Sequence, residues 1–117
     1  MAYTAITNNT TTHEGLALVP VAGAHAGNKV ANASTGVMVY IKNTSGSVTT
    51  TVTFQADATL RDVPVQDVSK AIAPGEEWIF GPLVPDVFNQ TGGDDINFTR
   101  WTYDSGGVDM EIFAWQP

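Results

Sequence analysis

Short β-branched and aromatic runs, separated by turns that contain Gly, Pro or Asn, are the main pattern in this sequence. No ten-residue stretch free of Gly and Pro places apolar side chains at the i, i+3, i+4 and i+7 positions of an amphipathic helix. Turn signals recur roughly every 8 to 15 residues, which favours a sandwich or a barrel over βαβ units. The 117 residues suffice for one domain, and the hydrophobic fraction of 43% suffices for its core. We therefore predict an all-β fold, a single-domain antiparallel β-sandwich of the jelly-roll or Ig-like type.

The first predicted hairpin joins residues 37–42 to residues 48–54 through a polar loop. Both runs are rich in β-branched and aromatic residues, which favour strands. Pairing Ile41 with Val48 puts the apolar side chains of both runs on one face, whereas a shift by one residue would oppose them to threonines. We therefore expect the two runs to be neighbours in one sheet.

Residues 96–115 form the second predicted hairpin, with its reversal at the glycines of 104–107. Its register pairs Arg100 with Glu111, an opposite-charge pair that supports the assignment. One face is apolar and is predicted to lie in the core: Thr99, Trp101, Tyr103, Val108, Met110, Ile112 and Ala114. The other face carries an aromatic cluster at the end far from the turn: Ile96, Phe98, Phe113 and Trp115.

Shorter elements are predicted between the two hairpins. Three short runs have strand character: 63–65, 68–73 and 77–80. Pro74 and Gly75 occupy the central positions of a type II turn. We expect the run at 77–80 to end at Gly81, and residues 84–89 to form a loop or a single helical turn.

The N-terminal third of the chain differs from the rest. Its start is rich in Thr and Asn, residues 22–33 are rich in Ala, Gly and Asn, and only residues 16–21 form a clear apolar run. We predict an extended N-terminal arm at 1–15 and a β-sandwich domain at 16–117, whose compact part begins near Gly36.

Charge and composition exclude several classes of function. Five Lys and Arg against twelve Asp and Glu give a net charge of −7, and the basic residues are scattered singly, which disfavours nucleic-acid binding. No apolar run approaches the roughly 20 residues of a membrane span, and no signal peptide is recognisable. The absence of Cys excludes disulfides and thiolate metal sites. We expect a soluble protein made in the cytoplasm of its host.

Candidate catalytic and metal-binding residues are few. His13 lies in the Thr-rich arm without a second His at metal-ligand spacing, and His25 lies in an Ala- and Gly-rich segment. The carboxylate pairs at 76–77 and 94–95 cannot converge on one site, because adjacent strand residues point to opposite faces. We therefore expect no enzyme, no cofactor, no metal and no small-molecule substrate.

The aromatic cluster of the second hairpin is a stronger candidate for function. Another sheet or the N-terminal arm could cover Ile96, Phe98, Phe113 and Trp115 within the subunit. Alternatively, these side chains form a subunit or partner interface, where aromatic residues are enriched. A third reading is a platform on which exposed rings stack against sugars.

Three segments resemble a known family of virus proteins. They are Ala-Tyr-Thr-Ala-Ile-Thr-Asn at 2–8, the run 37–54, and Ile-Ala-Pro-Gly-Glu-Glu-Trp-Ile-Phe-Gly-Pro at 72–82, followed by Val-Phe-Asn-Gln at 87–90. The chain thereby resembles the small head-decoration, or capsid cement, proteins of tailed bacteriophages over most of its length. The segment 57–70 departs from the family pattern, since it is longer and more acidic.

The resemblance implies an all-β subunit, often trimeric, that binds the major capsid protein on the outer surface of the assembled virion and strengthens the shell. It implies no catalytic residues. We expect the arm to engage the capsid or a neighbouring subunit through five residues: Tyr3, Thr4, Ile6, Thr7 and Asn8. We expect the homo-oligomer to form through the aromatic cluster. Two alternatives stay open, a tail or fibre module that binds a host-surface glycan and another head or tail structural component.

Overall fold

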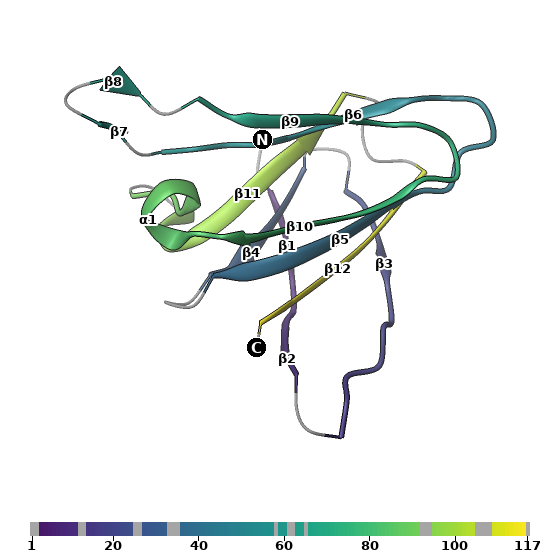
Figure 1. Ribbon diagram of the computed structural model, residues 1–117, viewed down its shortest axis with the longest axis horizontal. Coiled ribbons are helices and arrows are strands. Elements are labelled where there is room, and N and C mark those ends of the chain that lie inside the picture. Colours follow the sequence, from purple (N-terminus) through teal and green to yellow (C-terminus); the bar gives the residue numbers. More distant parts are fainter. Residues whose placement is uncertain are drawn as a thin grey trace.

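The computed structural model describes residues 3–11, 14–24, 27–32, 36–57, 59–60, 63–64, 66–91, 95–104 and 109–116. Within these residues the chain forms two five-stranded sheets that pack together, a short β-ribbon and one helical turn, α1 (Pro85–Phe88). The predicted all-β sandwich is therefore confirmed. Figure 1 shows the strands of the two sheets and, in purple, the N-terminal strands that run beside them.

The sheets are mixed rather than purely antiparallel. Sheet A has the order β1 (Thr4–Ile6), β4 (Asn28–Ala31), β11 (Phe98–Tyr103), β6 (Thr50–Phe54) and β9 (Val68–Ile72). Sheet B has the order β10 (Glu77–Leu83), β5 (Val37–Asn43), β12 (Met110–Gln116) and β2 (Asn8–Thr10), and β3 (Val21–Ala22) also pairs with β12. The ribbon consists of β7 (Thr59–Leu60) and β8 (Val63–Pro64). The parallel pairs are β1 with β4 and β2 with β12.

Neither predicted hairpin exists, because each connection crosses from one sheet to the other. β5 lies in sheet B and β6 in sheet A, and β11 and β12 are separated in the same way. Ile41 pairs with Ile112 and Trp78 instead of Val48, which is exposed before β6 begins. Alternating side chains reach the core equally well from either sheet, so the pattern that suggested a hairpin is also satisfied by two strands that face each other.

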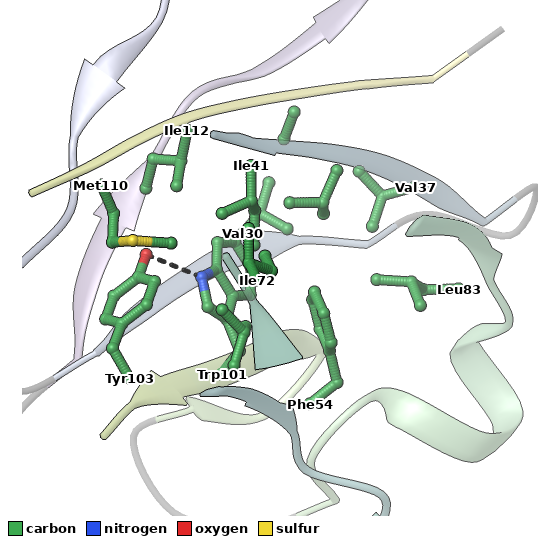
Figure 2. Packing of buried hydrophobic residues seen from close by; sticks show 13 residues of the cluster. Val30, Val37, Ile41, Phe54, Ile72, Leu83, Trp101, Tyr103, Met110 and Ile112 are labelled. Carbon is green, nitrogen blue, oxygen red and sulfur yellow. Dashed lines mark hydrogen bonds between the residues drawn. The ribbon is translucent and has the colours of Figure 1, made fainter. Parts of the chain in front are cut away.

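The core lies between the sheets and contains the predicted apolar face of β11 and β12. Thr99, Trp101, Tyr103, Met110, Ile112 and Ala114 are all buried, and Val108, predicted on the same face, lies outside the described residues. The Phe54 ring centroid lies 5.4 Å from that of Trp101 and 4.9 Å from that of Phe80. Figure 2 shows the indole Nε1–H of Trp101 donating to the hydroxyl of Tyr103, at 2.8 Å. Burial in the core raises the pKa of the Tyr103 hydroxyl.

Most of the central elements fall where the sequence predicts them, although β7 was not predicted. Gly75 has a φ of +81° and the Glu76 amide donates to the Ala73 carbonyl, which confirms the turn. The strands β8 and β9 and the helical turn α1 also fall where they were expected. The strand at 77–80 does not end at Gly81. It continues as β10 to Leu83, and a register shift after Phe80 accommodates the Gly81–Pro82 pair.

The expectation that the compact part begins near Gly36 is wrong. β1 pairs with β4 and β2 with β12, so the N-terminal segment supplies an edge strand to each sheet of its own subunit. The apolar run at 16–21 contributes only the start of β3. Residues 14–20, called the returning limb below, precede β3 in the chain. The arm is therefore integrated into both sheets.

Candidate interaction surface

Tyr3 anchors the N-terminal arm to the outer face of sheet A. Its hydroxyl accepts a hydrogen bond from Gln55 Nε2 at 2.6 Å, and the Arg100 guanidinium carbon lies 4.9 Å from the ring centroid. Gly27 has a φ of +103°, and a Cβ at this position would lie 2.9 Å from the Tyr3 ring and 2.4 Å from the Trp101 carbonyl oxygen. Glycine is therefore required where the arm meets the sheet.

The remaining predicted arm residues also contact their own subunit. The Thr4 amide donates to the Gly27 carbonyl, and Ile6 packs against the core. Asn8 donates from Nδ2 to the Ala31 carbonyl at 2.8 Å. Thr7 is exposed between the two strands. The structure thus places Thr4, Ile6 and Asn8 on the edge strands β1 and β2, with Tyr3 before β1 and Thr7 between the two strands. The binding of these five residues to a capsid or a neighbouring subunit stays a prediction.

A polar network behind Tyr3 was missed by the sequence analysis. Arg100, predicted to pair with Glu111, donates from Nη1 to Asp95 Oδ2 at 2.7 Å and from Nε to Gln55 Oε1 at 2.6 Å. Lys29 donates to the other Asp95 oxygen at 2.7 Å. The hydrogen bond from Lys29, followed by that from Arg100, lowers the pKa of the Asp95 carboxyl against the opposing effect of burial. Asp95 thereby orients the cation that covers Tyr3.

The four residues of the aromatic cluster do not form one patch. Phe98 lies on the outer face of sheet A with the Lys29 ammonium 4.8 Å from its ring centroid, and Ile96 is exposed in the preceding loop. Phe113 and Trp115 lie on the outer face of sheet B, with ring centroids 6.0 Å apart. The cluster is divided because β11 and β12 belong to different sheets. The role of these residues in an oligomer stays a prediction.

Sheet B carries an apolar groove on its outer face. Tyr40 and Phe113 point outward but are only 9% and 7% exposed, and both line this groove together with the returning limb. The groove has a volume of about 270 Å³ and is lined mainly by Leu16, Leu18, Tyr40, Ile79, Phe113 and Trp115. Phe113 is therefore buried within its own subunit, whereas Leu18 and Ile79 are 54% and 58% exposed and leave the groove open.

Charged side chains border one end of the groove. Lys42 pairs in register with Glu77 on one side and with Glu111 on the other. The Tyr40 hydroxyl donates to Glu77 Oε1 at 2.5 Å. Desolvation, and then the bond to Glu77 and the charge of Glu111, raise the pKa of Tyr40 to about 12. The Tyr40 hydroxyl therefore stays protonated at neutral pH and links the apolar groove to its charged border.

The residues considered earlier for chemistry are not gathered into a site. His13, His25 and Asp94 lie outside the described residues. Glu76 accepts a hydrogen bond from the Ala73 amide. Within the described ranges no three His, Cys, Asp or Glu side chains are grouped to hold a metal ion, and no helix is long and apolar enough to cross a membrane.

Comparison with known proteins gave no match. No protein-family model, no curated protein and no solved structure matches this chain.

Proposed function

We propose that this chain is a structural protein of a tailed-bacteriophage virion, which binds the exterior of the assembled capsid and stabilises it. The observation that carries the proposal is the open apolar groove of sheet B, because exposed apolar surface of this kind is typical of sites that a partner protein covers. The resemblance of residues 2–8, 37–54 and 72–82 to capsid cement proteins supplies the class of partner, the major capsid protein.

The proposed mechanism is mechanical bridging between capsid subunits. β1 and β2 are edge strands, and an edge strand can accept a strand of a neighbouring protein through main-chain hydrogen bonds. In a homotrimer, three weak contacts would act together, and avidity would raise the overall affinity well above that of one contact. The partner is therefore a protein, and the proposal requires neither a cofactor nor nucleic acid.

The test is a binding assay with expanded, undecorated capsids of the same phage. Purified protein is mixed with the capsids, the copy number is read from sedimented particles, and light scattering gives the mass of the free protein. We expect stoichiometric binding that Ile79→Glu reduces, since a charge would enter the groove. Val48→Glu, at an apolar residue that is similarly exposed but does not line the groove, is the matched control. No association with capsids would refute the proposal.

The surroundings of Trp78, Trp101 and Trp115 do not favour glycan binding. Trp101 is fully buried, and the Lys70 ammonium lies 4.1 Å from the Trp78 ring centroid, so it covers one face of that ring. Trp115 packs against Phe113 in the groove. A glycan array that gives Trp-dependent binding would move the assignment to a tail or fibre module.

A further inference from the structure

The groove of sheet B has the size of a pocket for a single side chain. Its volume of about 270 Å³ lies below the roughly 300 to 1,000 Å³ of typical small-molecule pockets. Its floor is formed by Tyr40 and Phe113, which are buried on two central strands and are therefore preformed. Leu18 and Ile79 form exposed walls, so the groove is accessible to an apolar side chain from outside.

The border of the groove adds a negative charge. Glu77 and Glu111 flank Lys42 on the outer face of sheet B. Among the described residues the ion pairs are those of Asp95, so neither Glu77 nor Glu111 is neutralised by a direct ion pair within that part of the chain. Two carboxylates against one ammonium leave this end of the groove acidic.

The charge distribution selects the kind of occupant. A second copy of this chain that faced this groove with its own groove would bring a second acidic border against the first, and like charges oppose such an approach. A partner with a positive charge beside its apolar anchor matches both parts of the surface. Glu77 lies two residues from Ile79 along β10, about 6.6 Å, which a basic side chain next to the anchor can span.

We propose that this groove is a docking site for a protein segment that carries a large apolar side chain directly followed by Lys or Arg. The apolar side chain enters between Leu18 and Ile79, and the cation lies against Glu77 and Glu111. This inference goes beyond the proposed function, because it names the chemistry of the partner segment and holds whether or not that partner is a capsid.

The test is a titration of ¹⁵N-labelled protein, followed by amide chemical shifts, with two blocked tripeptides. The probes are acetyl-Phe-Lys-Arg-amide and its acidic counterpart acetyl-Phe-Glu-Asp-amide. We expect saturable shifts of the Ile79, Phe113 and Trp115 amides with a dissociation constant on the order of 1 mM for the basic peptide. The acidic peptide should bind at least about fivefold more weakly. The inference is overturned by shifts that do not saturate, that occur away from the groove, or that are equal for both peptides.

Two variants separate the apolar and the electrostatic contributions. Ile79→Ser removes one wall and should abolish saturable binding, whereas the control Val48→Ser should bind as the parent does. The double change Glu77→Gln and Glu111→Gln should give the two peptides equal affinities, because both negative charges are lost. The amide oxygen introduced by Glu77→Gln can still accept the hydrogen bond from Tyr40. Unchanged binding by the Ile79 variant, with an otherwise unchanged spectrum, would overturn the inference. Because no capsid is present, this failure is distinct from a failure of capsid binding.

Discussion

Replacement of Tyr3 by Ala should release the N-terminal arm without unfolding the sandwich. The change removes a half-buried ring, its contact with the Arg100 guanidinium and the hydrogen bond from Gln55. Partial burial of the ring contributes about 1 kcal/mol, the cation–π contact about 0.5 to 1 kcal/mol, and the hydrogen bond about 1 kcal/mol. The free energy that opposes opening of the arm should fall by about 2 to 3 kcal/mol, because the three contributions act on the same docking step.

Native-state hydrogen exchange measures this opening directly. The Thr4 amide donates to the Gly27 carbonyl and reports on the arm, whereas the amides of β5 report on the centre of sheet B. A loss of about 2 to 3 kcal/mol corresponds to exchange of the Thr4 amide that is roughly 30- to 150-fold faster. Tyr3→Phe keeps the ring and loses only the hydrogen bond, so it should accelerate exchange by about fivefold.

Two results would refute this reasoning. Unchanged exchange of the Thr4 amide in Tyr3→Ala would mean that the side chain does not hold the arm. Equal acceleration at Thr4 and throughout β5 would mean that the arm does not open separately, and that the substitution instead lowers the global free energy of unfolding.

Three further substitutions test the surroundings of the arm and the core. Asp95→Asn should lower the free energy of unfolding at neutral pH by about 2 kcal/mol, measured by urea denaturation. The partners of Asp95 depress its pKa below the ordinary 3.8, so the stability that they add to the folded state is present above that pH. This stability is lost as the pH falls through the folded-state pKa. The variant should therefore lose this acid dependence of the free energy of unfolding. Gly27→Ala should lower the free energy of unfolding by at least about 2 kcal/mol, because the added Cβ overlaps its neighbours and the backbone is strained. The control Gly75→Ala, which has open space around it, should lower it by only about 1 kcal/mol. Equal values from thermal unfolding would contradict the steric argument. Trp101→Phe should lower the free energy of unfolding, measured by chemical denaturation, by about 2 kcal/mol, because the core loses volume and the hydrogen bond to Tyr103. An unchanged free energy of unfolding would contradict the packing described.

The side of each strand that faces the core could be predicted from the sequence. Alternation with a period of two marked Trp101, Tyr103 and Ile112 as inward-facing, because in a strand successive side chains point to opposite faces whatever strand lies next to them. The turn at Gly75 was equally local, since a positive φ at that position of a type II turn favours glycine. Such features depend on a few neighbouring residues and are therefore readable from the chain alone.

Strand pairing, and with it the candidate site, was decided only by the tertiary structure. The polar connections after β5 and β11 fit a hairpin, but they can also cross the roughly 10 Å between two packed sheets, and alternation does not distinguish the two. The Thr- and Asn-rich start resembles a free arm, yet its side chains bond to strands far along the chain, as Asn8 does to Ala31. The same holds for the groove, where Leu18, Ile79 and Phe113 meet from three distant segments. Alternation shows only which side of a strand is apolar. The contacts at the arm and the groove depend on which strands become neighbours, and long-range packing of the whole core determines the strand order.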